Sequence, residues 1–152
     1  MPYSVNQGVR IHHRTEGEGQ PLVLQPGFTD SLDTWYDLGY VEALKPHYRL
    51  ILIDARGRGA SDKPHQPDAY EQERNVADIT TVLDDLNVTR AHYFGYSMGG
   101  RIGFAIARYA PDRVHSLVLG GGSPYPHSQG GLAPMLEVLK RDAEAISGMW
   151  GG

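Results

Sequence analysis

The residues best suited to chemistry are the serine and glycines of the segment Gly95-Tyr96-Ser97-Met98-Gly99. A serine that ends a strand and begins a helix is held in a sharp turn, which presents its hydroxyl group as a nucleophile. Such a turn is strained, and it is tolerated when the residues two positions before and after the serine are very small. Gly95 and Gly99 meet this requirement. Ser97 is therefore the candidate nucleophile.

The same pattern has a simpler interpretation, in which Ser97 only caps a helix after a glycine-rich turn. With 19 glycines in the chain, a chance G-x-S-x-G match is expected in roughly one of eight chains of this composition. The surroundings favour the nucleophile, because residues 91–96 are strand-like and residues 98–109 are helix-like. Helix capping also leaves the glycines on both sides of the serine unexplained.

A second segment predicted to lie beside the serine is Gly27-Phe28, which follows the apolar run 21–25. Glycine lets the backbone turn sharply after the run, so that the amide of Phe28 can face the space above Ser97. The amides of Phe28 and Met98 would then form an oxyanion hole. In isolation a Pro-Gly dipeptide indicates only a turn, but its place directly after a core strand favours the oxyanion role.

A third segment, 54–62, is also rich in glycine and follows another apolar run. Its spacing matches neither a P-loop nor a dinucleotide-binding loop, so no nucleotide is expected. We assign Asp54 a structural role, in which its carboxylate accepts hydrogen bonds that shape a tight loop beside the site. No histidine pair has the helical spacing of a metal site, and we expect neither a metal nor another cofactor.

Apolar runs and helical patterns alternate along the chain. The runs predict strands at residues 9–14, 21–25, 48–55, 91–96 and 114–120, with an antiparallel edge pair near the first of them. A capping box of Asp68 and Glu71 is expected to begin a helix that ends at Asn87, residues 98–109 form a second helix, and residues 35–44 a weaker one. The alternation predicts an α/β fold, with helices on both faces of a mostly parallel sheet.

In order and approximate spacing, the three loops resemble those of the α/β-hydrolase family over about residues 9–123. The elbow sequence G-Y-S-M-G-G is similar to that of small esterases, carbon–carbon-bond hydrolases and perhydrolases. The resemblance implies that Ser97 attacks a carbonyl group and that the amides of Phe28 and Met98 hold the oxyanion. Haloalkane dehalogenases and epoxide hydrolases are similar but use aspartate as the nucleophile, so Ser97 argues against them.

The family's catalytic acid and histidine follow the serine in the chain, on strands that come after a helical cap. The resemblance therefore implies that residues 1–122 are the N-terminal core of a hydrolase fold lacking its C-terminal strands, and that 123–152 begin a cap or lid. The acid and base then lie outside these residues. His127 is a weak candidate base, because a loop histidine followed by Ser-Gln-Gly-Gly is more often solvated. Pro26 also stands where the family usually has histidine.

Two functions are open at this point. One is a serine hydrolase, incomplete in this chain, that acts by acyl transfer on a small ester or related carbonyl substrate. The other is a catalytically incomplete hydrolase-like domain that binds a small molecule or a partner without turnover, since a serine hydroxyl without a base is a poor nucleophile. In the family layout residues 114–120 are an inner strand, so we expect self-association or a companion C-terminal segment to cover its edge.

Composition narrows the class of protein further. A chain of 152 residues with 40% hydrophobic and 21% charged residues indicates one globular domain. The net charge of −4, without runs of like charge, predicts neither a nucleic-acid nor a membrane partner. The first residues lack a signal-peptide pattern and the chain has no cysteine, so we expect a cytoplasmic protein.

Overall fold

The computed structural model describes residues 2–122, which form a six-stranded sheet in the order β1-β2-β4-β3-β5-β6. The strands are β1 Tyr3–Asn6, β2 Val9–Glu16, β3 Gln20–Gln25, β4 Tyr48–Ile53, β5 Ala91–Tyr96 and β6 Val114–Gly120. The four strands β4, β3, β5 and β6 run parallel to one another, whereas β2 is antiparallel to both β1 and β4. The predicted mostly parallel sheet and its antiparallel edge pair are confirmed.

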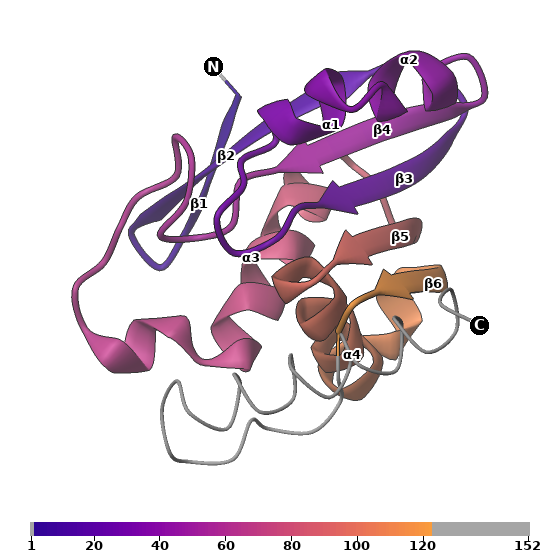
Figure 1. Cartoon of the computed structure of the whole chain (residues 1–152). Helices are drawn as coiled ribbons and strands as arrows, with labels where there is room; N and C mark the ends of the chain where they lie inside the picture. Colours follow the sequence, from indigo (N-terminus) through magenta and orange to yellow (C-terminus); the bar gives the residue numbers. More distant parts are fainter. Residues whose placement is uncertain (1, 123–152) are drawn as a thin grey trace, which may run out of the picture.

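Helices cover both faces of this sheet, as predicted (Figure 1). The short helices α1 Asp33–Asp37 and α2 Tyr40–Leu44 lie on one face, and α3 Gln72–Asp85 and α4 Met98–Tyr109 lie on the other. Two 3₁₀ helices, η1 Pro67–Tyr70 and η2 Pro111–Arg113, precede α3 and β6. Within residues 2–122, no helix is both long enough and apolar enough to cross a bilayer.

Alternate residues of the central strands fill two separate cores, as expected for strands that are covered on both faces. The larger core packs Val23, Ile51 and Ile53 against residues of α3 and α4 such as Val82 and Ile106. On the opposite face, the intervening residues of β3 and β4 pack against residues of α1 and α2. This second core contains Leu22, Leu24, Leu50, Leu52, Trp35 and Val41. The sheet is thereby fixed between two helical layers.

The register of the parallel strands brings the segments that follow β3, β5 and β6 to the same end of the sheet, where the carboxyl ends of these strands lie. Gln25 pairs with Gly95 at the carboxyl ends of β3 and β5, and Tyr96 pairs with Gly120 at the ends of β5 and β6. The segments that follow these strands therefore emerge side by side. Open α/β sheets bind ligands at this carboxyl-terminal end of their strands.

The weak helix predicted at residues 35–44 is instead two short helices. α1 ends at Asp37 and α2 begins at Tyr40, because Gly39 has a φ of 82° and cannot continue a right-handed helix. The apolar residues on both sides of the break gave the false appearance of one helical pattern.

The predicted capping box of Asp68 and Glu71 is also wrong. Asp68 lies inside η1, and the helix α3 begins only at Gln72. Glu71 occupies the N-cap position of α3 but makes no side-chain capping hydrogen bond. Pro67 at the start of η1 favours a short 3₁₀ turn at this point, which displaced the helix start by a few residues.

β6 is the last strand of the described sheet and pairs with β5 alone. None of its residues is fully buried, and Val118 is 59% exposed. The expectation that its edge is covered stays a prediction. The expected cap or lid at residues 123–152 lies outside the described residues.

Candidate active site

Ser97 lies between the last residue of β5 and the first residue of α4, with φ 56° and ψ −112°. Positive φ is uncommon for a residue with a side chain, and it persists only where surrounding packing imposes it. The predicted strained turn at the strand-to-helix junction of Ser97 is therefore confirmed. Its catalytic role is a separate question.

The glycines around the serine are required by close backbone packing. A β-carbon on Gly95 would overlap the carbonyl group of Gly99, and one on Gly99 would overlap the carbonyl group of Gln25 at the end of β3. Gly103, one turn later, would collide with Leu119 and Tyr93. These contacts confirm that the elbow needs small neighbours, and they show that α4 packs directly onto the sheet.

Two hydrogen bonds fix the elbow to its surroundings. The amide of Ser97 donates to the carbonyl oxygen of Gly120 over 2.6 Å, and the phenol of Tyr93 donates to the carbonyl oxygen of Gly99 over 2.6 Å. Complete burial raises the pKa of the Tyr93 phenol well above its usual value. It therefore stays protonated and continues to donate across the ordinary pH range.

The loop after β3 comes directly beside the serine. A β-carbon on Gly27 would lie 3.4 Å from Cβ of Ser97, and the amide of Asp30 donates to the carbonyl of Gly27 over 3.1 Å to close a turn. Phe28 occupies this turn and is 59% exposed. The guanidinium carbon of Arg58 lies 3.7 Å from the centre of its ring, which holds the loop from the outer side.

The amides predicted to form the oxyanion hole belong to Phe28 and Met98. Neither donates a hydrogen bond to another group in residues 2–122, and Met98 is the first residue of α4, where backbone amides have no partner inside the helix. Helix N-termini favour negative charge. Convergence of the two amides on a single oxyanion stays a prediction.

Asp54 shapes the neighbouring loop, as its assigned structural role predicts. Its carboxylate is buried and accepts hydrogen bonds from the amides of Leu32 at 2.7 Å and Ala60 at 3.0 Å, and it lies 2.8 Å from Nδ1 of His12. Because Leu32 belongs to the segment after β3, this carboxylate also ties the turn beside Ser97 to the sheet. Gly59 allows the approach, since a β-carbon there would overlap the carboxylate.

A buried ion pair below this loop was not anticipated from the sequence. Arg56 donates to both carboxylate oxygens of Asp78 over 2.7 Å and to the carbonyl of Ala69 over 2.6 Å. Asn6 adds a further donor to Asp78 at 2.8 Å. Asp78 lies beside the apolar residues of the predicted helix. Because a buried charge normally has a charged partner, an acidic residue at this position could have indicated a buried basic residue opposite it.

No histidine in residues 2–122 forms a hydrogen bond with the Ser97 hydroxyl. Three histidines of that range contact other groups: His12 with Asp54, His13 with Ser4, and His92 with Ser116 and Gln20. The His12–Asp54 pair is separated from β5 by intervening strands, which places it about 10 Å or more away. His127 lies outside the described residues.

A family model described as "alpha/beta hydrolase fold" matches residues 20–138. The chain belongs to the α/β-hydrolase family. The match confirms the family that the sequence motifs predicted.

Relatives of this α/β hydrolase include a Bacillus subtilis (strain 168) protein provisionally named 2-succinyl-6-hydroxy-2,4-cyclohexadiene-1-carboxylate synthase. It is 35% identical over 80% of this chain and 44% of its own length. An enol-lactonase from Burkholderia xenovorans LB400 is 32% identical with a TM-score of 0.74, over 80% of this chain and 47% of that one.

A hydrolase from Pseudomonas aeruginosa PA01 has a TM-score of 0.77 at 31% identity, over 98% of this chain and 57% of that one. The chain therefore spans only about half the length of these relatives. These matches show the fold of this α/β hydrolase.

The hydrolase also has a pocket beside the elbow that sequence patterns did not predict. It has a volume of about 220 Å³ and is lined by Pro26, Gly27, Asp30, Thr34, Trp35, Leu38, Tyr40, Phe94 and Tyr96. These residues come from the turn after β3, from α1 and α2, and from the end of β5. The only signal for it in the sequence was the concentration of aromatic residues around the two loops.

Proposed function

We propose that this α/β hydrolase acts as a serine hydrolase on a small ester or related carbonyl substrate, with Ser97 as the nucleophile. The backbone of Ser97 supports this most strongly: a non-glycine residue at φ 56° between β5 and α4, enclosed by glycines that tolerate no β-carbon. Strain of this kind is retained where it positions a reactive group.

In the proposed reaction, Oγ of Ser97 attacks the carbonyl carbon and its proton passes to a base. The carbonyl electron pair moves onto oxygen, and the amides of Phe28 and Met98 stabilise that negative charge. Collapse of the intermediate breaks the bond to the leaving group, which takes the proton from the base and leaves an ester on Ser97. Attack by water then releases the acid. The base and its acidic partner lie outside residues 2–122.

The name of one structural relative supports the substrate class. An enol-lactonase opens a cyclic ester, and its fold matches this chain at a TM-score of 0.74. The turn at Gly27, next to Ser97, suits approach of a carbonyl oxygen to backbone amides. We therefore propose esters or lactones as the substrate class.

We propose the cytoplasm as the location of this protein, because its cysteine-free sequence favours a reducing compartment.

A second function has one observation in its favour. Because no histidine within residues 2–122 contacts the Ser97 hydroxyl, the chain alone could bind a small molecule or a partner without turnover. An oxyanion hole without a base still gives a modest rate enhancement over water. The two functions therefore differ in whether Ser97 is acylated selectively, which can be measured even where acylation is slow.

The test is site-specific labelling with a fluorophosphonate, mapped by mass spectrometry. We expect slow labelling of the 152-residue chain, concentrated at Ser97 and absent in Ser97→Ala. The partly exposed Ser31 is the internal control. Equal labelling of both serines would contradict the proposal, since a preformed oxyanion site should favour one of them. Rapid stoichiometric labelling would show a base within the chain, with His127 the first to replace.

We also propose that a second copy or a companion C-terminal segment pairs with the edge of β6. Within the described sheet this strand pairs on one side only. The unpaired N–H and C=O groups on the other side of such a strand readily form hydrogen bonds with another strand. Amide hydrogen exchange of residues 114–120, with the solution mass from light scattering, tests this proposal. A monomer whose β6 amides exchange at the rate of an open edge would contradict it.

A further inference from the structure

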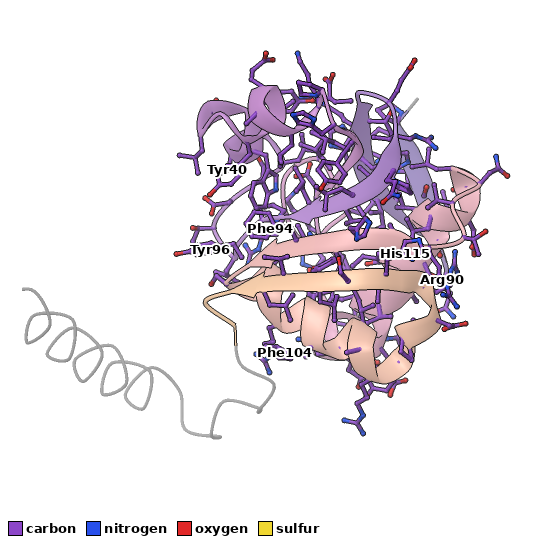
Figure 2. The ribbon with its side chains drawn as sticks, turned by 90° about the vertical axis from the view of Figure 1, so that its right-hand side faces the viewer. Tyr40, Arg90, Phe94, Tyr96, Phe104 and His115 are labelled. Carbon is purple, nitrogen blue, oxygen red and sulfur yellow. The ribbon has the colours of Figure 1, made fainter. Side chains whose placement is uncertain are left out.

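The pocket beside the elbow is lined largely by apolar groups, and aromatic rings form much of its wall. Four rings line it, from Trp35, Tyr40, Phe94 and Tyr96, together with the aliphatic side chain of Leu38. Figure 2 shows Tyr40, Phe94 and Tyr96 gathered on one side of the molecule, toward the carboxyl end of β5. Apolar walls with a few polar groups are typical of small-molecule sites.

Two of the lining residues connect this pocket directly to the candidate nucleophile. Tyr96 precedes Ser97 in the chain, and the β-carbon position of Gly27 lies 3.4 Å from Cβ of Ser97. A group that fills the pocket is therefore held next to the serine. From this placement we infer that the pocket binds a compact hydrophobic group of the substrate, neutral or positively charged, while the carbonyl group of the substrate reacts at Ser97. This inference rests on the proposed function.

The size of the pocket sets the size of the group. Its volume is about 220 Å³, and a cavity of roughly 150 Å³ accommodates benzene. An aromatic ring with a short side chain therefore fits, whereas a long acyl chain does not fit entirely. Trp35 packs against Phe94 at 5.2 Å and against Tyr40 at 5.1 Å between ring centres. These mutual contacts hold the wall in place before a ligand arrives.

The charge of the bound group is set by Asp30. It is the only charged residue among those that line the pocket, and its Oδ2 lies 3.3 Å from the β-carbon position of Gly27. No ion pair of Asp30 occurs within residues 2–122. The Arg58 guanidinium stacks on Phe28 and does not line the pocket. The carboxylate therefore repels an anionic ligand and attracts an ammonium group, which the aromatic faces also favour.

Three ligands of one shape and different charge test this inference: phenylacetamide, phenylacetate and 2-phenylethylammonium. Each is titrated into the ¹⁵N-labelled 152-residue chain at pH 7.5, and amide shifts are followed at Gly27, Thr34 and Tyr96. We expect saturable shifts there, with a Kd on the order of 1 mM for ligands of this size. The anion should bind about two- to fivefold more weakly than the amide, and the cation at least as tightly.

Two variants separate the pocket from non-specific binding. Asp30→Asn should remove the disadvantage of the anion relative to the amide, whereas the part of the ammonium preference that comes from the aromatic faces should remain. Tyr40→Ala should weaken all three at least threefold, whereas the control Tyr109→Ala should not, since both tyrosines are about equally exposed, at 39% and 41%, and of the two only Tyr40 lines the pocket. Because Tyr40 also lines a second apolar pocket, the positions of the shifted amides decide which of the two pockets is occupied. Shifts confined to the second apolar pocket, near Tyr48 and Val118, would overturn the inference, as would an unchanged preference in Asp30→Asn.

None of the three ligands is an ester, and the group that they share is the phenyl ring, which the pocket and not the Ser97 hydroxyl is proposed to hold. Ser97→Ala should bind all three unchanged while losing fluorophosphonate labelling. Labelling at Ser97 without binding in the pocket would overturn this inference and leave the proposed function intact. Binding in the pocket without selective labelling would contradict the proposed function alone.

Discussion

The amide of Ser97 and the carbonyl oxygen of Gly120 form a hydrogen bond of 2.6 Å. This bond joins the strained elbow to the carboxyl end of β6, the outermost strand of the described sheet. A β-carbon on Gly100 would lie only 3.0 Å from the same carbonyl oxygen. The elbow is thus supported by β3 on one side and β6 on the other, and several of its properties can be tested by substitution.

Gly99→Ala should destabilise the fold, because its β-carbon would overlap the carbonyl group of Gln25, and backbone cannot move aside as a side chain can. We expect a loss of about 1–3 kcal/mol or more in the free energy of unfolding, measured by urea denaturation. Gly39→Asn is the control, since Gly39 has open space around it and asparagine tolerates its φ of 82°. Equal effects of the two changes would contradict the packing seen here.

Gly103→Ala tests the contact between α4 and β6 in a different way. Its β-carbon would collide with Cδ2 of Leu119, the end of a flexible side chain that a second substitution can remove. We expect the double variant Gly103→Ala, Leu119→Ala to be more stable than the sum of the single effects predicts, by about 0.5–3 kcal/mol. Strict additivity in urea denaturation would show that the two residues are not in contact.

Asp78→Ala should be among the most destabilising single changes. It leaves the Arg56 guanidinium buried without its carboxylate partner, where the side chains are only 2% and 4% exposed. Breaking a buried pair in this way costs about 3–5 kcal/mol. Removing Glu42 from its exposed pair with Lys45 should cost less than about 1 kcal/mol. Thermal denaturation of Asp78→Ala and Glu42→Ala side by side distinguishes the two kinds of pair.

His13 should make the protein less stable in mild acid. Burial, followed by repulsion from His12, lowers the pKa of His13 below its unfolded value of 6.5. Between the folded and unfolded pKa values the unfolded chain binds more protons, so stability falls as pH decreases below about 6.5 until the folded pKa is passed. Urea midpoints between pH 7.5 and 5.0 should fall less in His13→Gln than in wild type.

A steeper or unchanged pH dependence in His13→Gln would contradict this prediction. The exposed His65→Gln serves as the control, because it alters the same chemical group without removing a buried one. Ser4 accepts or donates a hydrogen bond at Nε2 of His13 over 3.1 Å, and glutamine retains some capacity for that contact.

The sequence alone determined the features that depend on local pattern. β5 and β6 begin and end where their apolar runs predicted, and Ser97 lies at the expected junction with glycines that packing requires. These features were predictable because strand periodicity, helix periodicity and the conformational freedom of glycine act over a few neighbouring residues. The family resemblance followed from the same local segments.

Tertiary structure decided what depends on residues distant in the chain. The sheet places β4 between β2 and β3 although β3 precedes it in sequence, and that order brings Asp54 beneath the turn before α1. The pocket likewise exists only because Asp30, Trp35 and Tyr96 come from separate elements. No periodicity links such residues, because their proximity arises from strand order and from the packing of α1 and α2 on the sheet.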